Sequence, residues 1–324
     1  MIHIEMINKM NLPSRGKCRY LWTIGNYSGI ASNYESAPIY RKLFISGIRK
    51  LDLDAIYLTS LIHLNRQEEI LKAKKIISNL AEIELLPKYL ELNKFVIDSK
   101  LIQPQGQMTK AYEALIALKE KCISIDSFWR DVCANKTISI IGNAPITSHL
   151  GNLIDQSDIV LRFNNFQIKN FELFVGRKTS AWCRICDIRP PFDQEHLFNQ
   201  IKTNIFTDNP LNIPVGMKFI DEIFNENKNF YFIPQEIVTD LAKQLNAIPS
   251  SGIRLLISLS KLRTQYNIRT NVFGFSFSNK KFNHKIFDHY FETKPESKER
   301  AHNITSEVML LRNTYPELTP RQDQ

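Results

Sequence analysis

Long apolar runs and paired cysteines are both missing from this 324-residue chain. No stretch of about 18 apolar residues occurs, so the sequence predicts no transmembrane helix. The N-terminal segment carries charge early and has no apolar core region, so we expect no secretory signal there. Five cysteines are an odd number in a large chain, which favours a reducing compartment over a disulfide scaffold. We therefore expect a cytoplasmic protein.

A long tail of one charge sign is also absent, although the charge is unbalanced. The net charge of +9 and the isoelectric point near 9.2 favour anionic partners: a nucleotide, a nucleic acid or an acidic membrane face. The basic residues stand in small clusters, each of which is best explained as solvated surface. No RNA-reading motif, zinc-finger spacing or helix-turn-helix signature accompanies them, so we expect no nucleic-acid partner. Peripheral contact with an anionic inner membrane would suit the basic surface.

The hydrophobic pattern divides the chain at about residue 134. Residues 1–134 carry mainly helical patterns, as at 68–81 and 108–121, and match no motif that gives them a role. In residues 135–324, short apolar runs alternate with helical stretches. The expected strands are 137–141, 159–163, 180–185, 204–207, 230–233 and 271–275, and the expected helices are 219–224, 237–245, 253–263 and 305–312.

Strands separated by helices predict an α/β fold: a Rossmann-like, mostly parallel sheet with helices on both faces, after a largely helical N-terminal region. In such folds ligands bind beyond the carboxyl ends of the strands. Gly142 and Asn143 follow the first expected strand, where an ordinary turn is the alternative to a ligand contact. Arg162 and Asn164 end the second strand. We interpret Asn164 as functional and Arg162 as structural, paired with Asp155 or Asp158.

A loop entering a helix is the second candidate. Pro249-Ser-Ser-Gly252 precedes an apolar run, and Ser250 or Ser251 would cap the helix. Free amides and the positive end of the helix dipole bind anions without a lysine, although a simple cap is the common alternative.

Two histidines flank one polar segment near the C-terminus. His289 and His302 each follow the usual pattern of a packed or surface histidine when taken alone. Their position downstream of the Pro-Ser-Ser-Gly loop favours a chemical role. With an ordinary pKa of about 6.5, histidine is a general base at neutral pH.

Two other patterns carry little weight. Cys183 and Cys186 have C-x-x-C spacing, but no second Cys/His pair completes a zinc site, and strand alternation points the thiols to opposite faces. Asp52-Leu-Asp54 matches the D-x-D of metal-dependent glycosyltransferases, but the tripeptide is common by chance. We expect no metal and no cofactor.

Together these segments resemble the sialylmotifs of the animal-type sialyltransferases, glycosyltransferase family 29. Residues 138–179 resemble the large motif, with its Gly-Asn turn, Val-Leu-Arg-x-Asn and Val-Gly-x-Lys-Thr. Residues 249–275 resemble the small motif, and residues 289–292 (His-Tyr-Phe-Glu) resemble the third. His302 with Glu307 resembles the very small motif, His-x-x-x-x-Glu. All four occur in family order.

The resemblance covers about residues 136–312. It implies a metal-independent, inverting transfer from a CMP-activated acidic sugar on a Rossmann-like fold of the GT-A variant type. His289 would stabilise the departing phosphate, His302 would deprotonate the acceptor hydroxyl, and Glu307 would support the local architecture. Asn143 and Asn164 would contact the donor nucleotide or its phosphate, beside Gly142. Ser250, Ser251 and Gly252 would bind the cytidine and ribose side of the donor.

The sequence departs from the animal enzymes at several points. They join a cysteine of the large motif to one of the small motif, whereas Ile138 stands at the first position and no cysteine follows Cys186. Their N-terminal membrane anchor has no counterpart. Ala144 replaces the serine of Gly-Asn-Ser, and the tyrosine often found before the small motif is absent from 245–249.

These features predict a bacterial member that transfers sialic acid from CMP-sialic acid to a glycan or glycolipid acceptor, such as lipopolysaccharide or capsule oligosaccharide. A Kdo transferase using CMP-Kdo is the nearest alternative, because the motifs read CMP and not the sugar. A non-catalytic nucleotide- or glycan-binding module is the alternative from another class.

Overall fold

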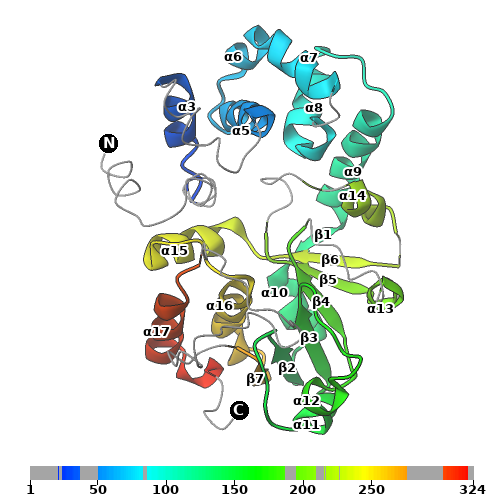
Figure 1. The fold of residues 1–324 in the computed structure, drawn as a ribbon, viewed down its shortest axis with the longest axis vertical. Helices are drawn as coiled ribbons and strands as arrows, with labels where there is room; N and C mark the ends of the chain where they lie inside the picture. The colour runs from blue at the N-terminus through cyan, green and yellow to red at the C-terminus, as the bar shows by residue number, and fades with distance from the viewer. Residues whose placement is uncertain are drawn as a thin grey trace. The chain divides into compact units, whose positions relative to one another are not determined.

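The computed structural model describes residues 21, 24–36, 50–82, 86–186, 195–208, 215, 217–225, 227–275 and 302–319. The chain forms two compact units (Figure 1). The helical unit comprises Met1–Lys121, Asn209–Asn225 and Ala242–Ile248. The sheet unit comprises Cys122–Asp208, Glu226–Leu241 and Pro249–Gln324. Each unit has a hydrophobic core of its own.

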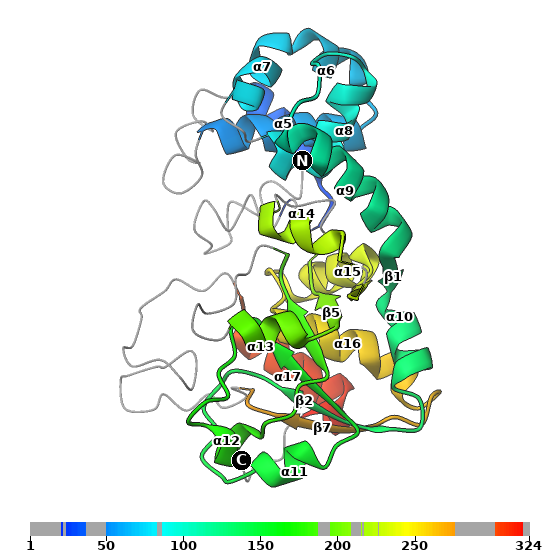
Figure 2. The ribbon, with the colours of Figure 1, turned by 90° about the vertical axis from the view of Figure 1, so that its right-hand side faces the viewer.

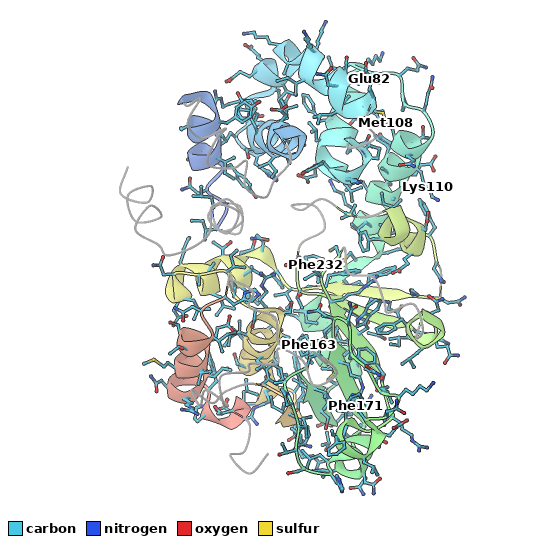
Figure 3. The ribbon with its side chains drawn as sticks, in the orientation of Figure 1. Glu82, Met108, Lys110, Phe163, Phe171 and Phe232 are labelled. Carbon is cyan, nitrogen blue, oxygen red and sulfur yellow. The ribbon has the colours of Figure 1, made fainter. Side chains whose placement is uncertain are left out.

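The helical unit packs short amphipathic helices around leucine and isoleucine side chains; Figure 3 labels Met108, one of its core residues. The pattern at 68–81 predicts one helix, but the backbone breaks at Ala73, whose N–H donates to the carbonyl of Ile70, three residues earlier. Ile77 and Leu80 are buried nonetheless. Its helices are α3 (Tyr27–Ser36), α5 (Lys50–His63), α6 (Gln67–Lys72), α7 (Lys74–Glu82), η1 (Leu86–Lys88), α8 (Leu90–Asp98), α9 (Gln107–Lys121) and α14 (Met217–Ile223).

The sheet unit contains a seven-stranded sheet in the order β1-β6-β5-β4-β3-β2-β7, and every neighbouring pair is parallel. The strands Thr137–Ile141, Ile159–Phe163 and Ala181–Arg184, in the middle of the sheet order or next to it, are buried on both faces, as is usual for parallel sheets. They are β1 (Cys122–Ser124), β2 (Thr137–Ile141), β3 (Ile159–Phe163), β4 (Ala181–Arg184), β5 (Thr203–Phe206), β6 (Asn229–Phe232) and β7 (Arg269–Phe273).

Helices cover both faces of this sheet (Figure 2). One face packs against α10, η2, α16 and α17 around Trp129, Leu161 and Leu255. The other packs against α11, α12 and α13. The remaining elements are α10 (Ile125–Ser127), η2 (Phe128–Val132), α11 (Gly151–Asp155), α12 (Glu172–Val175), α13 (Glu195–Gln200), α15 (Gln235–Leu245), α16 (Ser251–Arg263), α17 (Ile304–Thr314) and η4 (Pro316–Leu318).

The predicted Rossmann-like α/β fold is confirmed. All six expected strands form; β2 and β3 have the expected bounds and the others shift by one or two residues. The seventh strand, β1, was not expected, because three residues are too few for a readable alternation. β1 and α10 lie upstream of residue 134 and belong to the sheet unit. The division of the chain by role at residue 134 stays a proposal. No helix in the described ranges is both long and apolar enough to cross a membrane.

Candidate functional site

The motif residues of the sheet unit gather where the parallel strands end. Because all strands run the same way, their carboxyl ends meet at one edge of the sheet, which is where such folds bind ligands. β2 leads into Gly142 and Asn143, β3 into Asn164, β5 into Thr207, and β7 into Gly274. The helix α16 begins beyond the same edge, since its first residues contact Thr207 and Phe275.

Gly142 is required by a close approach of two backbones. Its N–H donates to the carbonyl of Phe273 at 2.8 Å, and the Ala144 N–H donates to the carbonyl of Gly274 at 2.8 Å. A Cβ built on Gly142 would overlap the carbonyl oxygen of Gly274. Gly274 itself has φ of +65°, which favours glycine. The turn after β2 is therefore locked to the turn after β7.

The N-terminus of α16 lies against an aromatic ring. A Cβ on Gly252 would collide with the side chain of Phe275. The Phe275 ring also contacts Phe163, the last residue of β3, edge-to-face with centroids 5.8 Å apart. Figure 3 labels Phe163 at the end of its strand. The absence of a side chain at Gly252 lets this ring sit against the first turn of the helix.

The side-chain amide of Asn143 uses its nitrogen within the protein and leaves its oxygen without a hydrogen bond to any described residue. Its Nδ2 donates to the carbonyls of Phe163 (3.0 Å) and Asn165 (3.4 Å), which fixes the orientation of the amide. Among the described residues, Oδ1 of Asn143 and Oδ1 of Asn165 are buried and accept no hydrogen bond. Acceptor oxygens suit a hydroxyl or amino group and repel a phosphate.

Asn164 joins two strand ends. Its backbone is left-handed, with φ of 47°, a conformation in which asparagine is enriched. Its Oδ1 accepts a hydrogen bond from the Ile185 N–H at 3.3 Å, and its carbonyl accepts one from Trp182 Nε1 at 2.8 Å. These contacts hold the ends of β3 and β4 together, so the side chain of Asn164 is engaged within the protein.

Arg162 is fully buried and holds the loop after α12. Its guanidinium donates to the carbonyls of Val175 (2.6 Å), Gly176 (3.2 Å) and Lys178 (3.0 Å). Asp155, expected as a partner of Arg162, accepts hydrogen bonds from the backbone N–H groups of Arg177 and Lys178. Arg162 therefore ties the Val-Gly-x-Lys-Thr segment to β3.

Ser250 and Glu307 connect two motifs that are far apart in the sequence. The Ser250 N–H donates to Glu307 Oε1 at 2.7 Å, and the Ser250 hydroxyl donates to Oε2 at 2.6 Å. Ser250 is also the N-cap of α16, accepting from the Ile253 N–H at 3.4 Å. Only 5% of Glu307 is exposed, and burial raises the pKa of its carboxyl to about 7, although the hydrogen bonds from Ser250 and the charge of Arg254 lower it.

Arg254, Asp208 and Thr207 complete this network and were not singled out from the sequence. The buried Arg254 guanidinium pairs with Asp208 and donates to the carbonyls of Pro249 (2.9 Å) and Thr207 (2.7 Å). The Thr207 hydroxyl donates to Ser251 Oγ at 2.9 Å. The sequence does contain a signal for this network, since Arg254 stands in an otherwise apolar helical run. An arginine that is buried in such a run almost always has a charged or polar partner.

His302 stands immediately before the N-cap of α17. That cap is Asn303, whose Oδ1 accepts from the Ser306 N–H at 3.1 Å. His302 is exposed and lies just before α17, the helix that carries Glu307. The helices α16 and α17 lie side by side in both views (Figures 1 and 2). His289 lies outside the described residues.

The Cys-x-x-Cys and Asp-x-Asp patterns belong to different units of the chain. Cys183 is buried in β4 and Cys186 is buried beyond it, and neither forms a disulfide. Burial raises the pKa of Cys183, and the Cys186 thiol donates to the carbonyl of Asp208 at 3.7 Å. Asp54 lies in α5 of the helical unit and accepts a hydrogen bond from Tyr34. In the described part of the chain, no three His, Cys, Asp or Glu side chains gather as a possible metal site.

Comparison with known proteins gives one family and two similar structures. Residues 93–185 match Glycosyltransferase family 29 (sialyltransferase). A mammalian sialyltransferase is 18% identical, with 64% of this chain and 77% of that chain covered and a TM-score of 0.42. The structure of a mammalian sialyltransferase in complex with Gal-beta-1-3GalNAc-ortho-nitrophenol is 18% identical, with 70% and 83% covered and a TM-score of 0.44. Both TM-scores lie below 0.5, so the relation to sialyltransferases rests on the family match over residues 93–185. No curated protein sequence matches the chain.

Proposed function

Since this chain is a sialyltransferase-like glycosyltransferase, with family 29 sequence over residues 93–185, we propose that it transfers sialic acid from CMP-sialic acid to a hydroxyl of a glycan acceptor. The transfer is inverting and needs no metal ion. The catalytic part is the C-terminal region from about residue 135, and residues 1–134 are assigned no role in it.

The contact between Ser250 and Glu307 is the observation that carries this proposal. Two hydrogen bonds, of 2.7 Å and 2.6 Å, join the Pro-Ser-Ser-Gly loop to the His-x-x-x-x-Glu segment, although 57 residues separate them. The loop is the segment suited to an anionic donor, and the second segment begins with a histidine suited to proton transfer. These hydrogen bonds therefore support a site in which the loop proposed to bind the donor adjoins the segment of the proposed base.

The donor nucleotide binds at the carboxyl edge of the sheet. The amides of Ser251 and Gly252 and the positive end of the α16 dipole meet the phosphate charge. The unpaired Oδ1 of Asn143 accepts a hydrogen bond from a ribose hydroxyl or from the cytosine amino group. Asn164 and Gly142 shape the edge through their backbone positions.

The chemistry is a single displacement at the anomeric carbon. The acceptor oxygen forms the new glycosidic bond while the bond from that carbon to the CMP phosphate oxygen breaks, which inverts the configuration. His302 takes the proton from the acceptor hydroxyl, a step that contributes about 10²–10⁴-fold in rate. CMP leaves with its negative charge, which His289 and the α16 N-terminus stabilise.

The acceptor is a lipopolysaccharide or capsule oligosaccharide in a bacterial cytoplasm. The net charge of +9 supports peripheral contact of the protein with an anionic inner leaflet, where such precursors are assembled. CMP-Kdo is the second donor to consider, because the same CMP-binding groups serve both acidic sugars.

Release of CMP by the purified protein tests this function. CMP-sialic acid and CMP-Kdo are supplied in parallel with a panel of glycan acceptors and a chelator, and His302→Ala is the matched variant. We expect release from CMP-sialic acid, and loss of turnover without loss of CMP binding in His302→Ala. Turnover with CMP-Kdo alone would show that the transferred sugar is Kdo and not sialic acid. Absence of turnover with both donors would leave a nucleotide- or glycan-binding module.

A further inference from the structure

The proton of the Ser250 hydroxyl is already donated in a hydrogen bond while Glu307 is ionised. A serine hydroxyl has one proton to donate and two lone pairs that accept. The proton goes to Glu307 Oε2 at 2.6 Å, and one lone pair accepts from the Ile253 N–H at 3.4 Å. In this state Ser250 can offer an incoming anion no hydrogen bond from its side chain.

An ionised Glu307 also opposes an anion electrostatically. Its carboxylate receives the Ser250 N–H at 2.7 Å and therefore lies at the N-terminus of α16, where positive dipole charge favours a negative ligand. The side chain is 95% shielded from solvent, so water screens its charge poorly. A phosphate bound at this helix end would stand near a second, unscreened negative charge.

The surrounding charges do not remove this conflict. Arg254, from α16, is the cation that acts on Glu307, but it is paired with Asp208 at the end of β5. One buried guanidinium thus faces two carboxyl groups. On its own helix, Glu307 has His302 before the first turn and Arg312 in the last turn. Burial raises the pKa of Glu307 to about 7, so the neutral acid is accessible under physiological conditions.

We propose that protonation of Glu307 reverses its hydrogen bond with Ser250 and frees the Ser250 hydroxyl proton for an anionic ligand. In the neutral state the Glu307 O–H donates to Ser250 Oγ, and Oε1 still accepts from the Ser250 N–H. Ser250 then accepts from Glu307 and from Ile253, and donates outward to the ligand. Donor binding at the α16 N-terminus therefore takes up a proton from solvent. The inference rests on the proposed function, because that function places the phosphate there.

Calorimetric titration with CMP tests the proton uptake directly. The heat is measured at pH 8 in two buffers of different ionisation enthalpy, HEPES and Tris, since phosphate buffer would compete for the site. If only the protonated form binds, linkage at a pKa of about 7 predicts uptake of about 0.9 proton per CMP at pH 8. Proton uptake by the CMP phosphate and by any histidine is the same in the wild type and in the matched variant Glu307→Gln. The difference in proton uptake between these two proteins is therefore the contribution of Glu307.

Glu307→Gln is that matched variant, because the amide imitates the neutral acid: its oxygen accepts from the Ser250 N–H and its NH₂ donates to Ser250 Oγ. We expect it to bind CMP about tenfold more tightly than the wild type at pH 8, about equally at pH 6, and without the extra proton. Ser250→Ala should weaken binding mainly at pH 6, where the wild-type hydroxyl is free; a mere loss of the helix cap would weaken it equally at both pH values.

The outcomes separate this inference from the proposed function. CMP binding by the wild type with no more proton uptake than by Glu307→Gln overturns the proton-linked switch and leaves the function intact. The absence of CMP binding to either protein at pH 6 overturns both. If Glu307→Gln fails to fold, the wild-type uptake measured in the two buffers and the pH dependence of Ser250→Ala decide the matter.

Discussion

Gly252 and Phe275 are in close contact at the start of α16, because a Cβ at position 252 would overlap the ring of Phe275. The methyl group of an alanine at position 252 would overlap the ring of Phe275, but this ring can rotate away because it belongs to a side chain. Alanine at 142 meets the carbonyl oxygen of Gly274, which is backbone and cannot move without breaking the β2–β7 turn contacts. The two glycines therefore predict different failures.

We expect Gly142→Ala to lower the free energy of unfolding by several kcal/mol, on the order of other severe steric changes. Gly252→Ala should cost about 1–3 kcal/mol and weaken CMP binding more than it weakens the fold. Denaturant unfolding and CMP titration measure the two effects. Gly106→Ala is the control. A Cβ at position 106 meets nothing within 4 Å, so only the positive φ of this residue lowers the stability of the variant. Equal losses in all three variants would contradict the steric argument.

Glu307 should make the stability of the sheet unit depend on pH. The folded pKa of about 7 lies above the ordinary value of 4.5, so between these values the folded state holds a proton that the unfolded state has lost. Stability is therefore fully present below pH 4.5 and falls as the pH rises through 7. Glu307→Gln should be more stable than the wild type at pH 8, by about 3 kcal/mol at most, and equal to it near pH 4.5. Urea unfolding at both pH values checks this; a difference that does not vary with pH would contradict it.

The pair of Arg254 and Asp208 should couple strongly. Both side chains are buried, so removal of one leaves the other charge unpaired at a cost of about 3–5 kcal/mol. We expect Arg254→Met and Asp208→Asn each to be destabilising and the double variant to be less so than their sum. A double-mutant cycle by denaturant unfolding measures the coupling. Arg130 and Asp131, an exposed pair in the same unit, serve as the control and should show none. Additive effects at 254 and 208 would refute the coupling.

Arg162 should control the segment from 175 to 178. Lysine retains the charge but cannot donate to three carbonyls in the geometry of a guanidinium. We expect Arg162→Lys to lower stability by about 2 kcal/mol and to speed amide hydrogen exchange at Arg177 and Lys178, whose N–H groups bind Asp155. Arg269→Lys, at an exposed position of β7, should leave both unchanged. Unaltered exchange at 177 and 178 in Arg162→Lys would show that the loop is held by other contacts.

Much of the fold was readable locally. Strands such as 137–141 and 159–163 are short β-branched and leucine-rich runs bounded by turn residues, and their information lies within five residues. The cap at Ser250 and the turn at Gly142 were readable for the same reason. Ala73 and β1 were not, because a one-residue break and a three-residue strand leave no periodicity to detect.

The sequence by itself determined most strand and helix segments, the absence of a long apolar run, and the family resemblance of about residues 136–312. Each of these depends on residues that are near one another in the chain or on motif order. Only the tertiary structure decided that Ser250 binds Glu307, that Arg254 pairs with Asp208, and that Asn143 presents its oxygen. These contacts follow from the strand order, which brings segments 20 to 57 residues apart to one edge of the sheet. No local pattern encodes such an order, because burial of both sheet faces as a whole selects it.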